Sequence, residues 1–156
     1  MIKDMSEPSF TPSDGQVDYT NIRYCPVINC VLKYQDKILL VQRSQDLRLY
    51  PGYWNGISGF LDDNKSVEEK VNEELADEVD VEAANIISIQ RGNVLVQESQ
   101  EYKKTWLVFP VLVKVNTDQI KLDWEASSHL WLSVEEAKKL KLLPGFDEVL
   151  NELLAL

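Results

Sequence analysis

Histidine, cysteine and basic side chains are scarce in this chain of 156 residues, which has one His, two Cys and 16 Lys and Arg against 26 Asp and Glu. Two cysteines are too few for a disulfide framework, and one histidine with two thiols makes a poor zinc site. The net charge of −10 disfavours a nucleic-acid polymer as partner, because most of the surface would repel phosphates. The length and the 44% share of hydrophobic residues predict one folded domain.

Long apolar runs and targeting signals are also missing. No segment approaches the roughly 20 apolar residues that span a bilayer, and residues 1–16 are polar where a signal peptide would be basic and then apolar. We therefore expect a soluble, cytoplasmic protein without a membrane partner. Residues 1–20 mix Ser, Thr, Pro, Asp and Gly without periodicity, which predicts a flexible arm ahead of a single domain over residues 21–156.

The negative charge is concentrated in one segment, residues 62–82. This segment holds ten acidic and two basic residues, a net charge of −8, which leaves −2 for the rest of the chain. Its acidic residues are Asp62, Asp63, Glu68, Glu69, Glu73, Glu74, Asp77, Glu78, Asp80 and Glu82. The acidity therefore indicates a local feature rather than a property of the whole surface.

Hydrophobic periodicity predicts a mixed α/β domain. Ser66 and Glu69 have capping-box spacing, and an apolar stripe at every fourth residue follows them, so a helix begins there. A second capping box at residues 133–136 and a Pro-Gly break at residues 144–145 predict two short C-terminal helices. Runs rich in β-branched residues predict strands at Tyr24–Tyr34, Lys37–Arg43, 56–61, 86–96, 105–115 and a shorter one ending at Leu132.

Glu74, Asp77 and Glu78 stand at i, i+3 and i+4 of the predicted helix, so their carboxylates converge on one face. Like charges at these spacings destabilise an isolated helix by about 0.2–0.5 kcal/mol per pair. A hard cation such as Mg²⁺, which prefers oxygen ligands, would reverse that effect. The alternative is a solvated acidic face, which is the usual meaning of an acidic run.

The segment from Gly59 onward resembles the Nudix box, G-x5-E-x7-R-E-U-x-E-E-x-G-U, in which U is apolar. Residues 59–81 supply the first glycine, the glutamate of the R-E pair (Glu74), the E-E pair (Asp77 and Glu78) and both apolar positions. Outside the box, residues 50–54 look like the usual P-G-x-W approach, and residues 129–136 look like the last strand and the helix after it. Three positions differ from the pattern: Lys65 for glutamate, Glu73 for arginine and Asp80 for glycine.

The resemblance implies an α/β/α sandwich that hydrolyses the diphosphate linkage of a nucleoside diphosphate joined to another group. It also implies Mg²⁺ or Mn²⁺ bound by Glu74, Asp77, Glu78 and the main-chain carbonyl of Ser58. Glu125 is the candidate for an additional metal ligand or the general base, and an exposed loop acid is an equally good alternative. The candidate contacts to a nucleotide-type substrate are Arg43, Arg48, Trp54 and Gly59, although a surface role for the arginines and a packing role for Trp54 are alternatives.

Two other functions compete with the hydrolase. A Nudix-fold module that has lost catalysis and binds a nucleotide or a protein is favoured by the changes at Lys65 and Glu73, since Lys65 lies at the other end of the predicted helix and Glu73 adds negative charge. Isomerisation of an isoprenoid diphosphate would need a histidine cluster that the chain lacks. The apolar C-terminal run of residues 149–156 could cover the sheet, which is our default, or join a homodimer interface.

Overall fold

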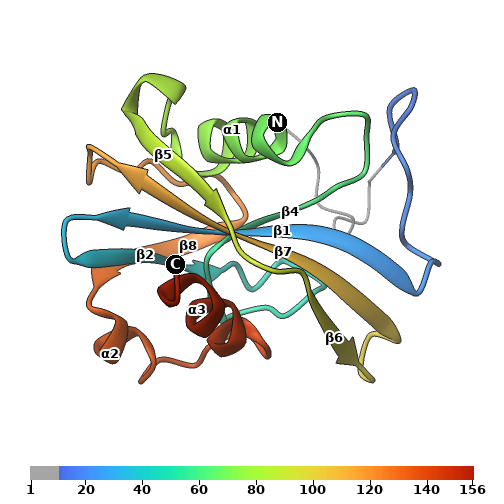
Figure 1. The fold of residues 1–156 in the computed structure, drawn as a ribbon. Coiled ribbons are helices and arrows are strands. Elements are labelled where there is room, and N and C mark those ends of the chain that lie inside the picture. The colour runs from blue at the N-terminus through green and yellow to red at the C-terminus, as the bar shows by residue number, and fades with distance from the viewer. Residues whose placement is uncertain (1–10) are drawn as a thin grey trace.

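A computed structural model describes residues 11–156, and the chain in it forms a mixed β-sheet between helices (Figure 1). None of the helices within these residues has the length and apolar character needed to cross a bilayer. The strands are β1 (Tyr24–Tyr34), β2 (Lys37–Arg43), β3 (Trp54–Asn55), β4 (Ile57–Phe60), β5 (Ile86–Arg91), β6 (Leu95–Ser99), β7 (Lys104–Val115) and β8 (Ala126–Leu132). The helices are α1 (Val67–Val79), α2 (Val134–Ala137) and α3 (Phe146–Leu154), with a 3₁₀ turn at Ala83–Asn85.

Strand β1 is at the centre of the sheet, which has the order β3-β2-β1-β7-β5. Strands β1 and β7 are parallel, and the other pairs are antiparallel. Strand β4 pairs with the first half of β1, so that Ile28 faces Gly59 and Asn29 faces Ser58. This pairing fixes the backbone that comes just before the acidic segment.

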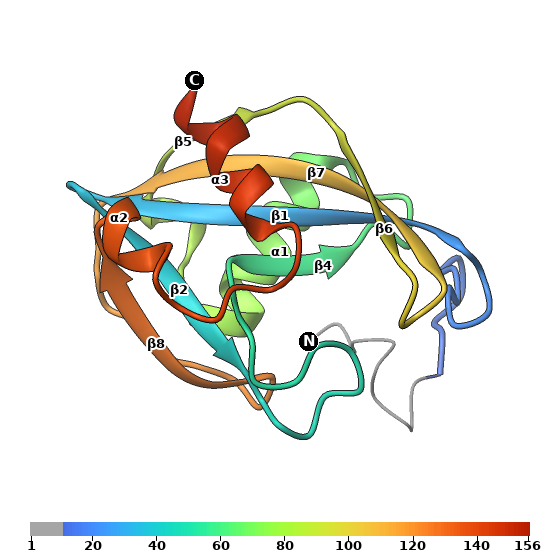
Figure 2. The ribbon, with the colours of Figure 1, turned by 90° about the horizontal axis from the view of Figure 1, so that it is seen from below.

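The sheet separates two apolar cores, as the α/β/α expectation requires. Helix α1 covers one face, and α2 and α3 cover the other (Figures 1 and 2). The apolar stripe of α1 (Val67, Val71, Leu75 and Val79) packs into the first core, and Phe146, Val149, Leu150 and Leu153 of α3 pack into the second. The C-terminal run thus packs within the chain, which was the default expectation.

One predicted strand, 86–96, is two strands in the structure. Strands β5 and β6 pair with different halves of β7, and the gap between them falls opposite Phe109 and Pro110. Proline has no N–H to donate to a neighbouring strand, which interrupts the ladder at this point. The expectation of one continuous strand was therefore wrong.

The segment before β1 contacts the domain where the structure describes it. The main-chain N–H of Val17 and the side-chain amide of Gln16 both donate to Asp62, and the ring of Tyr19 stacks on Phe60 at 6.1 Å between centroids. Residues 1–10 of the predicted arm lie outside the described residues. The flexibility of residues 1–20 stays a prediction.

Candidate active site

A cleft lies between β4, α1, the loop before β8 and the segment after α2. Its volume is about 770 Å³, which includes the open space at its mouth. Six of the residues selected from the sequence line this cleft: Arg43, Ser58, Gly59, Glu74, Glu78 and Glu125. The other three, Arg48, Trp54 and Asp77, are not among its lining residues. The fold thus brings residues from β2, β4, α1 and the loop before β8 to one place.

Gly59 leaves the space that the carboxylate of Glu74 occupies. A Cβ atom at residue 59 would lie 2.6 Å from Cδ and 2.7 Å from Oε1 of Glu74, which is closer than real Cβ contacts. Glu74 is 3% exposed, and its Oε1 is buried without a hydrogen-bond donor among the described residues. A glycine is therefore required here by close approach, and it faces a carboxylate oxygen that nothing in residues 11–156 satisfies.

The loop before β8 brings two more carboxylates to α1. The N–H groups of Lys121 and Asp123 donate to the carbonyls of Val79 and Glu78, each at 3.1 Å, which ties the loop to the end of the helix. The N–H of Glu125 donates to Oδ1 of Asp123 at 3.0 Å, while Oδ2 of Asp123 is buried without a donor in the described chain. We call Glu74, Glu78 and Glu125, which line the cleft, together with Asp123, which accepts a hydrogen bond from Glu125 but does not line the cleft, the carboxyl cluster.

Burial raises the pKa of three members of this cluster, Glu74, Glu78 and Asp123. It raises the pKa of Glu74 to about 8, against the opposing effects of a hydrogen bond with Glu78 and the charge of Lys70. Removal from water also raises the pKa of Glu78 well above its usual value, and the charges of Glu125 and Glu74 raise it further. For Asp123 the first cause of its raised pKa is again burial. Neighbouring carboxyls that share hydrogen bonds must keep protons between them unless a cation replaces those protons.

The donor set of the cluster fits a hard divalent cation. The described residues hold no preformed group of three or more Asp, Glu, His or Cys side chains that could hold a metal ion. Glu78 makes hydrogen bonds with Glu74 and Glu125. The buried oxygens without donors on Glu74 and Asp123 are the type of ligand that Mg²⁺ and Mn²⁺ prefer. Binding of a cation here would release protons.

Aromatic side chains line another part of the cleft. The indole N–H of Trp106 donates to the hydroxyl of Tyr50 at 3.1 Å, the ring of Phe60 lies 6.1 Å from that of Trp106, and all three residues line the cleft. A planar apolar group could stack here next to the carboxyl cluster. The cleft is therefore lined by both carboxyl groups and aromatic rings.

The comparisons with known proteins agree on a family. A family model described as "NUDIX domain" matches residues 23–153. This chain belongs to the NUDIX domain family. It is similar to an uncharacterized Nudix hydrolase, YvcI, of Bacillus subtilis (strain 168), with 26% identity over 128 residues that cover 80% of this chain and 76% of that protein.

Solved structures show the same fold. The NUDIX domain of Shewanella oneidensis NrtR, solved with ADP ribose, has a TM-score of 0.70 at 19% identity and covers 83% of this chain and 86% of its own. An Ap4A hydrolase of C. elegans has a TM-score of 0.70 at 20% identity and covers 84% and 96%. Nudix hydrolases generally use divalent metals, in keeping with the donor set of the cleft.

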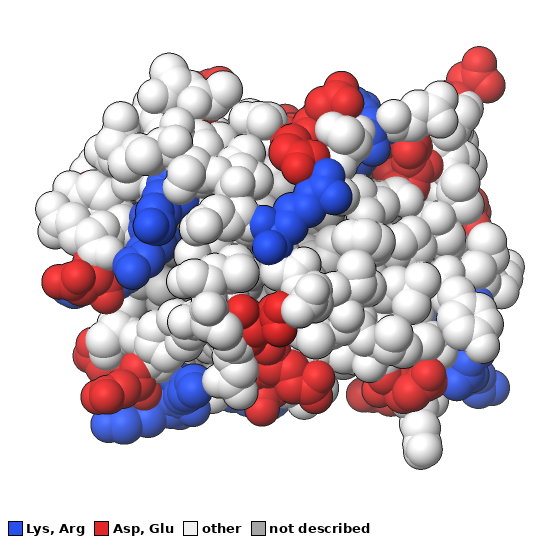
Figure 3. All heavy atoms as spheres, viewed as in Figure 1, with Lys and Arg blue, Asp and Glu red and all other residues white. Residues whose placement is uncertain are grey.

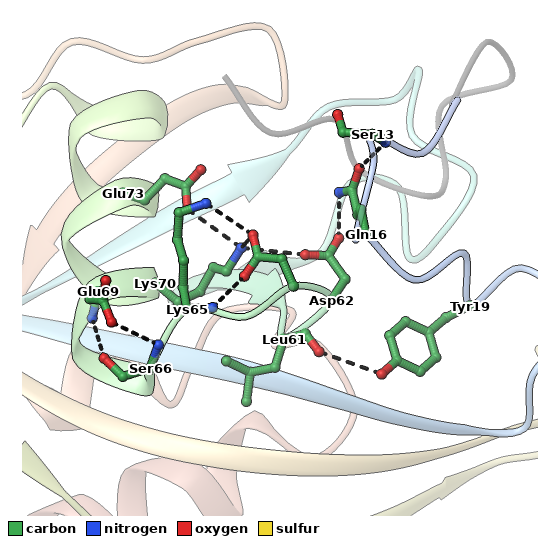
Figure 4. Close-up of polar contacts among 11 residues, drawn as sticks. Ser13, Gln16, Tyr19, Leu61, Asp62, Lys65, Ser66, Glu69, Lys70 and Glu73 are labelled. Atoms are coloured by element: carbon green, nitrogen blue, oxygen red, sulfur yellow. Dashed lines mark hydrogen bonds and ion pairs between the residues drawn. The ribbon is translucent and has the colours of Figure 1, made fainter.

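Two of the three residues that differ from the Nudix pattern, Lys65 and Glu73, lie close together in the structure. Lys65 and Glu73, expected at opposite ends of the helix, lie with Nζ and Oε2 3.4 Å apart, and the Nζ of Lys70 also lies 3.4 Å from Oε2 of Glu73 (Figure 4). The extra negative charge of Glu73 is thus compensated by two lysines. Asp80 ends α1 in the left-handed conformation (φ +59°) that the Nudix pattern reserves for glycine.

The remaining predicted Nudix residues have various surroundings. The Nε of Arg43 donates to the carbonyl of Leu49 at 3.0 Å, Arg48 is exposed, and Asp77 is half-buried on α1. Trp54 exchanges backbone hydrogen bonds with Lys141 and Leu143 and packs against the second core. Sequence reasoning missed Asp123 and Trp106. Asp123 lies two residues before Glu125, and this Asp-x-Glu spacing was a usable signal in the sequence. Trp106, by contrast, looks like an ordinary core residue of a strand.

Proposed function

We propose that this Nudix protein hydrolyses the diphosphate linkage of a nucleoside diphosphate joined to another group, with Mg²⁺ or Mn²⁺ as cofactor. The observation that carries the proposal is the cleft itself. It places Glu74, whose buried Oε1 has no hydrogen-bond donor among the described residues, together with Glu78 and Glu125 beside aromatic side chains, which matches a substrate with a diphosphate at one end and a nucleobase at the other.

Residues of the cleft, together with Asp77 of α1, take the following roles in this proposal. Glu74, Asp77, Glu78 and the main-chain carbonyl of Ser58 would hold the metal, which when bound neutralises diphosphate charge and lowers the pKa of water. Glu125 accepts the proton of the attacking water, because it lines the cleft next to Glu78. Trp106, Tyr50 and Phe60 hold the nucleobase by stacking, and Arg43 contacts the phosphates.

The surroundings of Glu73 favour an enzyme over a module that has lost catalysis. The change from arginine to Glu73 was the main support for that module, because it suggested surplus charge at the metal ligands. Glu73 instead faces Lys65 and Lys70, and the carboxyl cluster keeps oxygens free for a cation. A domain that only binds a nucleotide has no need of such oxygens.

The test is an assay of the purified protein with a panel of nucleoside triphosphates, nucleotide sugars, dinucleoside polyphosphates and ADP-ribose, each with Mg²⁺ or Mn²⁺. We expect release of a nucleoside monophosphate and a second phosphate-containing product from at least one member, and EDTA should stop the reaction. ADP-ribose and diadenosine polyphosphates come first in the panel, since the similar structures were solved with ADP ribose or belong to an Ap4A hydrolase. No turnover on any member, together with no metal binding by calorimetry, would overturn the proposal.

A further inference from the structure

Five charged side chains form a closed network at the start of α1. The Nζ of Lys70 lies 2.9 Å from Oδ2 of Asp63, 3.3 Å from Oδ1 of Asp62 and 3.4 Å from Oε2 of Glu73. Lys65 contacts two of the same oxygens, at 3.0 Å on Asp63 and 3.4 Å on Glu73. Figure 4 shows both ammonium groups reaching toward the carboxylates of the loop that precedes the helix. These five residues are the lysine network.

Lys70 is the centre of the lysine network. Its side chain has no exposed surface, and a buried ammonium is tolerated only where paired carboxylates replace its water. Asp62 is held from its other side as well, because the amide of Gln16 donates to its Oδ2 at 2.7 Å. The position of this ammonium is therefore determined by the loop, the helix and the segment before β1 together.

Lys70 also lies one helical turn before Glu74. Residues at i and i+4 are neighbours on a helix surface, and both side chains are buried on α1. Glu73, which follows in the same turn, points to the two lysines and not to the cleft. Lys70, the one cation of α1, thus lies one helical turn from the residue whose carboxylate faces Gly59, and its positive charge opposes the rise in the pKa of Glu74.

We propose that Lys70 is a positioning residue for Glu74, and that the rest of the lysine network holds its ammonium in place. In the Nudix pattern an arginine at position 73 and a glutamate at position 65 carry opposite charges to those found here. In this chain the cation is Lys70, which lies about one turn nearer the start of the helix than position 73. Its carboxylate partners are Asp62, Asp63 and Glu73. The inference rests on the proposed function, since Glu74 acts there as a metal ligand.

The test compares two variants of equal net charge. Lys70→Met removes the cation, and Lys65→Glu/Lys70→Met/Glu73→Arg also removes it but supplies the arginine and glutamate of the Nudix pattern. We measure Mn²⁺ affinity by calorimetry, the melting temperature without metal, and kcat and KM. Lys70→Met should weaken Mn²⁺ binding by about tenfold, as loss of an outer-shell partner commonly does, and should lower kcat with little change in KM. The triple variant should regain most of that affinity.

Arg91→Met is the matched control, because Arg91 binds Glu68 of the same helix with its Nε at 2.8 Å, away from the lysine network. It should leave Mn²⁺ affinity unchanged. If Lys70→Met does not fold, Lys65→Met, Glu73→Gln and their double variant replace it. Each single variant should then weaken Mn²⁺ binding, and the double variant should weaken it by less than the product of the two effects.

The outcomes separate the two proposals. Mn²⁺ affinity that stays unchanged in Lys70→Met, or that is not regained by the triple variant, overturns the positioning role while the unmodified protein still binds metal and turns over its substrate. In the replacement set, effects that simply multiply overturn it as well. Failure of the unmodified protein to bind Mn²⁺ overturns the proposed function, and the positioning role falls with it.

Discussion

The acidic segment and the loop before β8 contain two sets of carboxylates with opposite surroundings. Asp62, Asp63 and Glu73 contact the ammonium groups of the exposed Lys65 and the buried Lys70. Oε2 of Glu73 lacks a hydrogen-bond donor but has both ammonium groups 3.4 Å away. In the carboxyl cluster of Glu74, Glu78, Asp123 and Glu125, two buried oxygens, on Glu74 and Asp123, also lack a donor in the described chain. The comparison shows that the acidic residues of 62–82 have two kinds of surroundings: some tie a loop to a helix through lysines, whereas Glu74 keeps a buried oxygen without a donor in the described chain.

The two sets also differ in their pKa shifts. Asp63 has its pKa lowered to about 2, because hydrogen bonds from Lys70 and Lys65 outweigh the effect of burial. Burial in the cleft raises the pKa of Glu74 to about 8. Acidity by itself is therefore a poor guide to a site, and the presence or absence of a paired cation is a better one. On the face shown in Figure 3, too, acidic groups occur in small separate groups, several of them beside basic side chains.

Glu78→Gln should break the carboxyl cluster and have the largest effect. We expect turnover to fall by more than about 100-fold, since loss of an outer-shell partner alone costs about 10- to 100-fold. The melting temperature of the metal-free protein at pH 8 should stay the same or rise, because a group that resists ionisation is replaced by a neutral one. Glu68→Gln, on the exposed side of the same helix, is the control and should keep its turnover. Equal turnover in Glu78→Gln and the unmodified protein would contradict the assigned site.

Gly59→Ala should disturb the cluster from its other side. The new Cβ would meet Cδ of Glu74 at 2.6 Å, so either the carboxylate or the strand must move, and such overpacking costs about 1–3 kcal/mol. We expect a lower melting temperature and Mn²⁺ affinity reduced by about tenfold.

Gly59→Ala/Glu74→Asp separates the two effects of this clash. The shorter side chain should relieve the contact and recover much of the melting temperature, whereas Mn²⁺ affinity should stay low because the ligand no longer reaches its place. Recovery of neither quantity would mean that Gly59 acts through the backbone and not through Glu74.

The pH dependence of stability should distinguish the two sets directly. Between the unfolded value of Glu74 (about 4.5) and its folded value of about 8, the folded protein binds more protons than the unfolded chain, so the melting temperature in EDTA should fall as pH rises. Asp63 has the opposite sign: its folded pKa of about 2 lies below the unfolded 3.8, so its contribution is lost as pH falls from about 4 to about 2.

Thermal melts of three proteins check these signs. Glu74→Gln should flatten the decline between pH 5 and 8, and Asp63→Asn should flatten the decline on the acidic side. Adding Mn²⁺ at pH 8 should raise the melting temperature of the unmodified protein, because binding to the folded state alone stabilises it. A melting temperature in EDTA that rises steadily from pH 5 to pH 8 would show that the carboxyl cluster is ionised without metal.

Much of the fold could be predicted from the sequence, because it depends on local signals. The capping box of Ser66 and Glu69 is present as predicted, and α3 begins directly after the Pro-Gly break at residues 144–145. The expected family and the α/β/α architecture are confirmed. The split of residues 86–96 into two strands was missed because its cause, Pro110, lies on the neighbouring strand.

The site was harder to predict, because its electrostatics depend on contacts between distant residues. Helical spacing brought Glu74 and Glu78 together, but it could not show that Lys65 folds back to Glu73 or that Asp62 is also held by Gln16. Of residues 50–54, Tyr50 lines the cleft and Trp54 does not, and Trp106, which also lines it, lies on β7 and was not among the predicted residues. The roles of Glu125 and Arg43 stay predictions until variants are assayed.

Asp80→Gly should have the smallest effect and should sharpen the comparison, because Asp80 is an acid of the same segment that belongs to neither set. Its backbone is left-handed (φ +59°), a conformation that aspartate adopts at some cost and glycine adopts freely. We expect a gain of about 0.5 kcal/mol, since the lost strain exceeds the extra entropy of a glycine in the unfolded chain. Asp80→Ala removes the same charge but keeps the strain, so it should lower the melting temperature. Both variants should keep the Mn²⁺ affinity of the unmodified protein. A change in that affinity in both would mean that the total charge of the segment, and not the carboxyl cluster of the cleft, attracts the metal.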